Sequence, residues 1–210
     1  MRKIGILGGT FDPVHFGHLR IAVECKEALG LDELRMIPCA LPSHRNEPDA
    51  NAQQRLEMLS LALADTKDII ADDRELKRKG YSYTVDTLES LKKTFPEAVF
   101  YLIIGSDSFQ NILQWHKWQS IVELANIVIA QRPDHGNDQE SLAGKTLAEK
   151  FCSVDEIKNA ESGKITCLGV SQLDISATRI RNLILEKRTL KFLLPDSVIQ
   201  FIEKHNLYKD

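Results

Sequence analysis

The sequence of 210 residues has few cysteines and no long apolar segment. Its four cysteines, Cys25, Cys39, Cys152 and Cys167, are far apart and form no CxxC pair, so neither a disulfide framework nor a structural zinc site is expected. No apolar run approaches the roughly 18 residues that a membrane span requires. The first residues form a short, glycine-interrupted apolar stretch that does not resemble a signal peptide. We therefore expect a cytoplasmic protein with reduced thiols and no membrane partner.

The chain also lacks a strong charge of either sign. Its net charge of -3 argues against a surface built to bind nucleic acid. Hydrophobic residues make up 43% and charged residues 27%, which is ordinary for a globular protein. A chain of this length buries roughly 70% of its unfolded surface, so one domain over residues 1–210 can fold without a disulfide or a metal. The sequence leaves the oligomeric state open, and a homo-oligomer is compatible with it.

Short apolar runs alternate with longer amphipathic stretches, which is typical of βα units around a parallel sheet. Strands are expected at Lys3–Leu7, Leu34–Pro38, Ile69–Ala71, Val99–Ile104, Ile127–Ala130 and Ile165–Leu168. Helices are expected at about residues 17–29, 52–64 and 84–95, and from about Ala177 and about Asp196. This pattern predicts an α/β fold with a doubly wound parallel sheet, helices on both faces and a helical C-terminal part at residues 175–210.

Residues 133–163 do not follow this rhythm and are rich in polar residues. We expect them to form an insertion within the single domain. One helix is predicted there, near Leu142–Phe151.

The first segment with a chemical pattern reads GGTFDPVHFGH and lies between a predicted strand and a predicted helix. It is neither a GxxxxGK[ST] phosphate loop nor a GxGxxG dinucleotide loop. Gly8 and Gly9 let the backbone approach a ligand closely, and the helix that follows offers unpaired N–H groups to an anion. His15 and His18 open that helix, where the dipole disfavours added positive charge unless a ligand such as a triphosphate supplies negative charge. The alternative is that His15 caps the helix and His18 is solvated.

The second segment reads ISATRIR and covers Ile175–Arg181, at the start of the predicted helix from Ala177. Ser176 or Thr178 could cap that helix, whose N–H groups could meet another part of a polyphosphate. Arg181 lies within about the first turn, where a cation opposes the helix dipole unless an anion is present. For this segment alone, an ordinary N-cap with exposed arginines is the alternative.

Taken together, the two segments resemble the HxGH and ISSTxIR signatures of the nucleotidyltransferase superfamily. Ala177 stands where the second signature has a serine, so a hydroxyl contact from that position is lost. The resemblance implies a Rossmann-like fold that binds ATP, with His18, His15 and Arg181 acting in catalysis. The ATP-binding positions that it implies are Gly8, Gly9, Thr10, Phe11, His15, His18, Gly105, Asp107, Ile175, Ser176, Thr178 and Arg181.

The middle of the chain resembles one branch of that superfamily. The runs LPSHRNEP, DDRELKRKGYSYTVDTL, IGSDSFQNILQWHKW and ANIVIAQRP are similar to those of bacterial nicotinate-nucleotide adenylyltransferases, which make deamido-NAD from nicotinate mononucleotide and ATP. The resemblance implies that Trp115 stacks on the pyridine ring and that Thr84 helps to bind its carboxylate. It also implies that His44, Arg45 and Arg132 contact the substrates. The alternatives are core packing for the tryptophan and plain solvation for the basic side chains; Trp118 is expected to be a packing residue.

The implied reaction needs little covalent chemistry from the protein. A phosphate oxygen of nicotinate mononucleotide attacks the α-phosphorus of ATP, and this phosphate is already largely anionic because its second pKa lies near 6. We therefore expect catalysis by alignment and charge stabilisation, without a general base. Mg²⁺ is expected to arrive with ATP, because the sequence offers no protein ligand cluster for it. Adenylyl transfer to nicotinamide mononucleotide or to another phosphate acceptor, and nucleotide sensing without turnover, stay open as alternatives.

Overall fold

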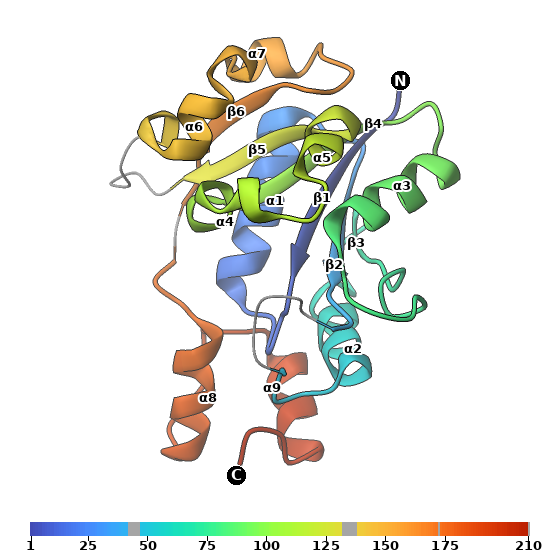
Figure 1. Cartoon of the computed structure of the whole chain (residues 1–210). Helices are drawn as coiled ribbons and strands as arrows, with labels where there is room; N and C mark the ends of the chain where they lie inside the picture. The colour runs from blue at the N-terminus through green and yellow to red at the C-terminus, as the bar shows by residue number, and fades with distance from the viewer. Residues whose placement is uncertain (42–46, 132–137, 172, 210) are drawn as a thin grey trace.

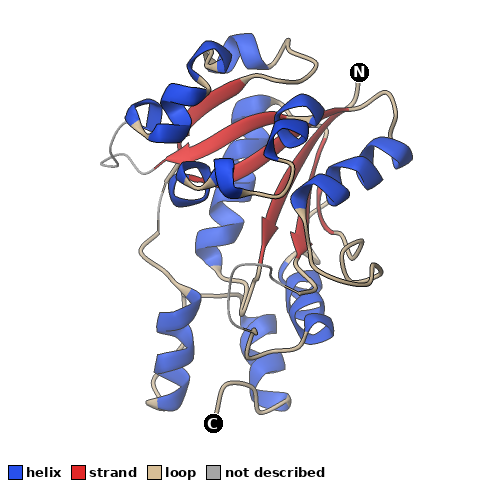
Figure 2. Cartoon of the chain, in the orientation of Figure 1, coloured by secondary structure: helices blue, strands red, loops and turns tan. Residues whose placement is uncertain are grey.

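The computed structural model describes residues 1–41, 47–131, 138–171 and 173–209. Within them one parallel sheet has the strand order β3-β2-β1-β4-β5-β6 (Figures 1 and 2). Its strands are β1 Lys3–Gly9, β2 Glu33–Pro38, β3 Ile69–Ala71, β4 Val99–Gly105, β5 Asn126–Gln131 and β6 Ile165–Gly169. Every strand that the sequence predicted is present, and each end lies within two residues of its predicted position.

The sheet is buried on both faces. On β4, Tyr101 and Ile103 belong to one hydrophobic core, whereas Phe100, Leu102 and Ile104 belong to the other. Successive side chains of a strand point to opposite faces, so a strand that is covered on both sides must be apolar throughout. This explains why β4 reads as an unbroken apolar run in the sequence.

Helices cover both faces, which confirms the doubly wound α/β prediction. The α-helices are α1 Phe16–Leu29, α2 Ala52–Ala62, α3 Thr84–Thr94, α4 Ser106–Gln110, α5 Trp118–Leu124, α6 Leu142–Thr146, α7 Val154–Ile157, α8 Ala177–Leu185 and α9 Asp196–Lys204. Helices α1, α2, α8 and α9 contribute to one core, and α3 to α6 contribute to the other. In Figure 1, α8 and α9 lie below the sheet, beyond the end of β1, where α9 packs beside α2. No helix of the described residues has the length and apolarity that crossing a membrane would require.

In the connection between β5 and β6 a helix begins at Leu142, as predicted, but it is shorter than the single helix expected near Leu142–Phe151. The chain forms α6, then the short 3-10 helix η3 at Ala148–Lys150, and then α7. The α-helix stops at Leu147, whose backbone departs from helical values with φ of -108° and ψ of 17°. The helical stretch ends altogether at Phe151, which is extended and forms a parallel bridge with Ile165 of β6. The connection packs into both cores, through Ala143 and Leu147 on one side and Ile157 on the other. Its status as an insertion stays a prediction.

The strand order places a crevice at the carboxyl ends of β1 and β4. The chain moves from β1 to β2 and β3 on one side and returns to β4 on the other. Sheets of this kind bind ligands at such a switch point, because the loops that follow the two strands diverge there. Gly8 and Gly9 end β1 and Gly105 ends β4, so three of the predicted ligand-binding positions meet at this crevice.

Candidate active site

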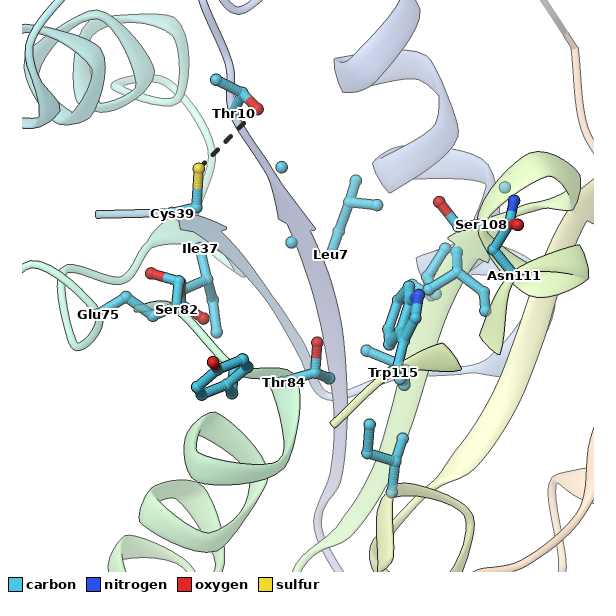
Figure 3. Close-up of a pocket in the computed structure, with 18 of the residues that line it drawn as sticks. Leu7, Thr10, Ile37, Cys39, Glu75, Ser82, Thr84, Ser108, Asn111 and Trp115 are labelled. Atoms are coloured by element: carbon cyan, nitrogen blue, oxygen red, sulfur yellow. Dashed lines mark hydrogen bonds between the residues drawn. The ribbon is translucent and has the colours of Figure 1, made fainter. Parts of the chain in front are cut away.

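A pocket of about 580 Å³ opens at the switch point of the sheet. Figure 3 shows Glu75, Ser82 and Thr84 on one side of it and Ser108, Asn111 and Trp115 on the other, with β1 between them. The predicted site residues that line this pocket are Gly8, Gly9, Thr10, Thr84, Gly105, Asp107 and Trp115. The structure therefore brings Gly8, Gly9 and Thr10 of the predicted nucleotide loop to one cavity with Thr84 and Trp115. The predicted catalytic residues His15, His18 and Arg181 are not among the residues that line it.

Two histidines stand at the start of α1, beside the end of β1. Their rings are stacked, with centroids 3.8 Å apart and an angle of 25° between the planes. His18 Nδ1 accepts a hydrogen bond from the backbone N–H of His15 at 3.4 Å, and the ring of Phe11 packs edge-on against His18 at 5.0 Å. His15 is 5% exposed, and its Nδ1 is the one buried side-chain nitrogen or oxygen in the described part of the chain that has no hydrogen-bond partner. A polar atom left in this state is costly, which favours a ligand as its partner.

Both imidazoles are neutral at pH 7. Burial lowers the pKa of His15 to about 4. Burial, together with the neighbouring His15, lowers the pKa of His18 to about 3. Neutral rings can stack without repulsion, and each still offers an N–H donor. An anionic ligand at this position would raise both pKa values, because it favours the charged form.

The glycine between the histidines is required by their close packing. A Cβ on Gly17 would lie 2.9 Å from His15 Nδ1, which is closer than real side chains approach. It would also lie 3.5 Å from the carbonyl oxygen of Ile175. The second sequence segment therefore lies next to the first at this glycine, where any side chain would crowd the His15 ring.

The second segment starts α8, as predicted. Ser176 is the residue that caps it, since its Oγ accepts from Arg179 N at 3.2 Å, while Thr178 is exposed. Arg181 donates from Nη1 to the carbonyl oxygen of Asp12 at 2.8 Å and pairs through Nε with Asp49 Oδ2 at 2.7 Å. The guanidinium thus lies against the loop that connects β1 to the histidines.

The side of the pocket that holds the predicted acceptor residues Thr84 and Trp115 is aromatic. Thr84 is the first residue of α3, and Tyr83 before it packs against the ring of His116 with centroids 4.6 Å apart. Trp115 and His116 both line the pocket. Trp118 lies in α5 and packs against the core without lining the cavity, as the sequence predicted.

Sequence reasoning missed two charged groups that shape this site. Glu75 lines the pocket and accepts from Thr87 Oγ1 at 2.6 Å, and burial raises the pKa of its carboxyl. Arg55 of α2 is 1% exposed and donates to the carbonyl oxygens of Thr10 and Cys39, both at 2.7 Å. A usable signal existed for Arg55, because it shares the buried face of α2 with Met58 and Leu59 at helical spacing. Glu75 follows no such periodic pattern.

Three predicted substrate contacts, His44, Arg45 and Arg132, lie outside the described residues. Among the described residues no group of three or more histidine, cysteine or acidic side chains could hold a metal ion. The carboxylate nearest the histidine loop, Asp12, is already bonded to two backbone N–H groups and a tyrosine.

The comparisons with known proteins point to one family. Residues 6–183 match the cytidylyltransferase-like family model. A protein of Hydrogenovibrio crunogenus named probable nicotinate-nucleotide adenylyltransferase is 45% identical over 99% of this chain and 98% of its own length. One of the same name from Pseudomonas syringae pv. tomato is 43% identical, over 99% of this chain and 94% of that protein.

Solved structures agree on the fold. Nicotinic acid mononucleotide adenylyltransferase of Plasmodium falciparum, complexed with NaAD, aligns with a TM-score of 0.74 at 20% identity, over 99% of this chain and 98% of that one. A putative nicotinate-nucleotide adenylyltransferase of Vibrio parahaemolyticus aligns with a TM-score of 0.65 at 17% identity, over 100% and 97% of the two chains. With its full-length relatives and its two signature segments meeting at Gly17, the chain belongs to the cytidylyltransferase-like family and, within it, to the nicotinate-nucleotide adenylyltransferases.

Proposed function

We propose that the protein transfers AMP from ATP to nicotinate mononucleotide, giving deamido-NAD and pyrophosphate in NAD biosynthesis. The observation that carries the proposal is a single pocket that reaches from the Gly8–Thr10 backbone to Thr84 and Trp115. The nucleotide loop and an aromatic acceptor site are thus within reach of one another. The names of the full-length relatives support the same reaction.

In the reaction, an anionic phosphate oxygen of the acceptor forms a bond to the α-phosphorus of ATP. The bond from that phosphorus to the bridging oxygen of the β-phosphate breaks, and pyrophosphate leaves with the electron pair. His18 donates an N–H to the α-phosphate as negative charge builds there, which needs only the neutral ring that the low pKa provides. His15, with its free buried Nδ1, orients the triphosphate. Thr178 and Arg181 hold the leaving pyrophosphate.

On the acceptor side, Trp115 supplies the face for the pyridine ring. Thr84 supplies its hydroxyl and backbone N–H, since the first residues of a helix have unpaired N–H groups. We assign His44, Arg45 and Arg132 to substrate contacts, and Asp107 and Gly105 to the nucleotide side of the pocket. Mg²⁺ enters on the triphosphate and neutralises its charge.

The test is product analysis with purified protein, ATP and Mg²⁺, offering nicotinate and nicotinamide mononucleotide in parallel. Deamido-NAD and pyrophosphate in equal amounts, with strong preference for the nicotinate substrate, is the expected result. Turnover that favours the nicotinamide substrate would keep the mechanism and overturn the acceptor. An increase in melting temperature with ATP but no pyrophosphate with either acceptor would favour a nucleotide sensor.

A further inference from the structure

The C-terminal end of the chain is bonded to the nucleotide loop. Tyr208 donates a hydrogen bond from its hydroxyl to Asp12 Oδ1 at 2.8 Å, across 196 positions of sequence. The tyrosine is 9% exposed, and burial raises the pKa of its hydroxyl, so it stays a donor. Its backbone has φ of 62°, a left-handed conformation that residues other than glycine rarely adopt. Such a conformation persists only where surrounding contacts enforce it.

The carboxylate that receives this bond is fully engaged. Asp12 is 5% exposed, and besides Tyr208 it accepts from Asp49 N at 2.9 Å and Ala50 N at 3.1 Å. Asp12 lies between Thr10 and the two histidines. It therefore joins the nucleotide loop, the start of α2 and the chain's end at one buried point.

Arg181 is bound to the same point. Its Nη1 donates to the main-chain oxygen of Asp12 at 2.8 Å and lies 3.9 Å from Asp12 Oδ2, which is too far for a hydrogen bond. Its Nε pairs with the more exposed Asp49 at 2.7 Å. The Asp12 carboxylate thus accepts hydrogen bonds from three neutral donors. The Arg181 guanidinium makes no hydrogen bond to that carboxylate.

We propose that Tyr208 is a positioning residue for adenylyl transfer, which keeps the Asp12 carboxylate from capturing Arg181. The inference rests on the proposed function, in which Arg181 holds the pyrophosphate. Without the phenol hydrogen, a buried carboxylate lacks one donor, and the nearest replacement is the guanidinium 3.9 Å away. A tighter Asp12–Arg181 pair would compete with the phosphates for that guanidinium. Tyr208 therefore acts on the ATP side of the reaction and not on the acceptor pocket.

The test is Tyr208→Phe in the full chain, which removes the hydroxyl and keeps the ring. We expect kcat/KM for ATP to fall by roughly 10- to 150-fold, the range for one hydrogen bond to a charged group, and KM for nicotinate mononucleotide to stay within about twofold. In a variant that already carries Arg181→Ala, Tyr208→Phe is expected to lower kcat/KM for ATP little further, because the effects of coupled residues are not additive. Lys209→Ala is the matched control, since Lys209 is exposed and, within residues 1–41, 47–131, 138–171 and 173–209, its ammonium bonds to Asn206 and not to Asp12 or Arg181.

The unsubstituted protein is assayed first. If it forms no deamido-NAD, the proposed function is refuted, whatever the variants do. With the reference protein active, additive effects of Tyr208→Phe and Arg181→Ala would overturn the positioning role. The positioning role would also be overturned if Tyr208→Phe lowered kcat/KM equally for ATP and for nicotinate mononucleotide. The same holds if the variant melted at a lower temperature but kept unchanged kinetics. Should Tyr208→Phe fail to fold, Asp12→Asn provides the second comparison. A neutral side chain at this position cannot capture Arg181, so the role predicts that kcat/KM for ATP stays within about twofold in Asp12→Asn. A loss toward ATP as large as that expected for Tyr208→Phe would refute it.

Discussion

The imidazole rings of His15 and His18 lie face to face with centroids 3.8 Å apart, on the first turn of α1. Such a pair is stable only while both rings are neutral, and burial keeps their pKa values at about 4 and about 3. Two donors are thereby held at a helix N-terminus, where backbone N–H groups also point at the ligand. The arrangement is suited to an incoming polyanion and adds no positive charge before it binds.

The histidine pair should make the protein sensitive to acid. An unfolded histidine has a pKa near 6.5, so below that pH the unfolded chain binds protons that the folded chain does not, and the free energy of unfolding falls as pH falls. The stabilisation is present above pH 6.5 and is lost toward pH 4. Between pH 7 and pH 5 each histidine should lower the free energy of unfolding by about 1–2 kcal/mol. Urea unfolding at both pH values measures this, and a His18→Gln variant that loses as much stability as the unmodified chain would contradict it.

His18→Ala should lower kcat by ~100-fold or more, the loss typical of one preorganised donor at a site of developing charge. KM for both substrates should change far less. Steady-state kinetics measures this, with His205→Ala as the control, because His205 packs against Phe201 at the far end of α9. A near-normal kcat would remove His18 from the role of transition-state donor.

Gly17→Ala should impair ATP binding because the added Cβ would lie 2.9 Å from His15 Nδ1 and would separate the stacked rings. We expect KM for ATP to rise by roughly tenfold or more, in line with about 1–3 kcal/mol for overpacking. Gly169→Ala is the matched control, since a Cβ there meets nothing within 4 Å. Similar behaviour of the two variants would show that the glycine is not needed for the histidine geometry.

Trp115→Ala should raise KM for nicotinate mononucleotide by roughly tenfold or more and leave KM for ATP nearly unchanged. The reason is the loss of ring stacking, worth about 1–3 kcal/mol for an aromatic base. Trp115→Phe should recover part of the loss. An equal rise for both substrates would indicate that Trp115 supports the fold of the pocket and not the pyridine ring.

Arg55→Met should destabilise the protein by about 2–5 kcal/mol, because the half-buried carbonyl oxygens of Thr10 and Cys39 would lose their donors. The methionine fills part of the space but offers no N–H. Chemical denaturation measures the change, and Gln53→Ala on the exposed side of α2 serves as the control. A change below about 1 kcal/mol would show that water replaces the arginine there.

The sequence by itself determined the sheet, because hydrophobic periodicity is a local property. Apolar runs placed all six strands to within two residues, and the start of α8 was located by Ser176 and the residues around it. The two signature segments placed His15, His18 and Arg181 at helix starts, and the structure has them at the starts of α1 and α8; their roles stay predictions. The helix from Leu142 in the β5–β6 connection is shorter than predicted, and Phe151 at its predicted end forms a bridge with Ile165, a pairing no local pattern predicts.

Only the tertiary structure decided what these residues contact. It brought Ile175 to Gly17, put a buried arginine behind Thr10, and bonded Tyr208 to Asp12. Residues far apart in the chain meet when strands, helices and the C-terminal end pack together, and the energy of burial that drives this depends on the whole core. The candidate site residues therefore lie in short sequence segments, whereas contacts between distant parts of the chain place their side chains relative to one another.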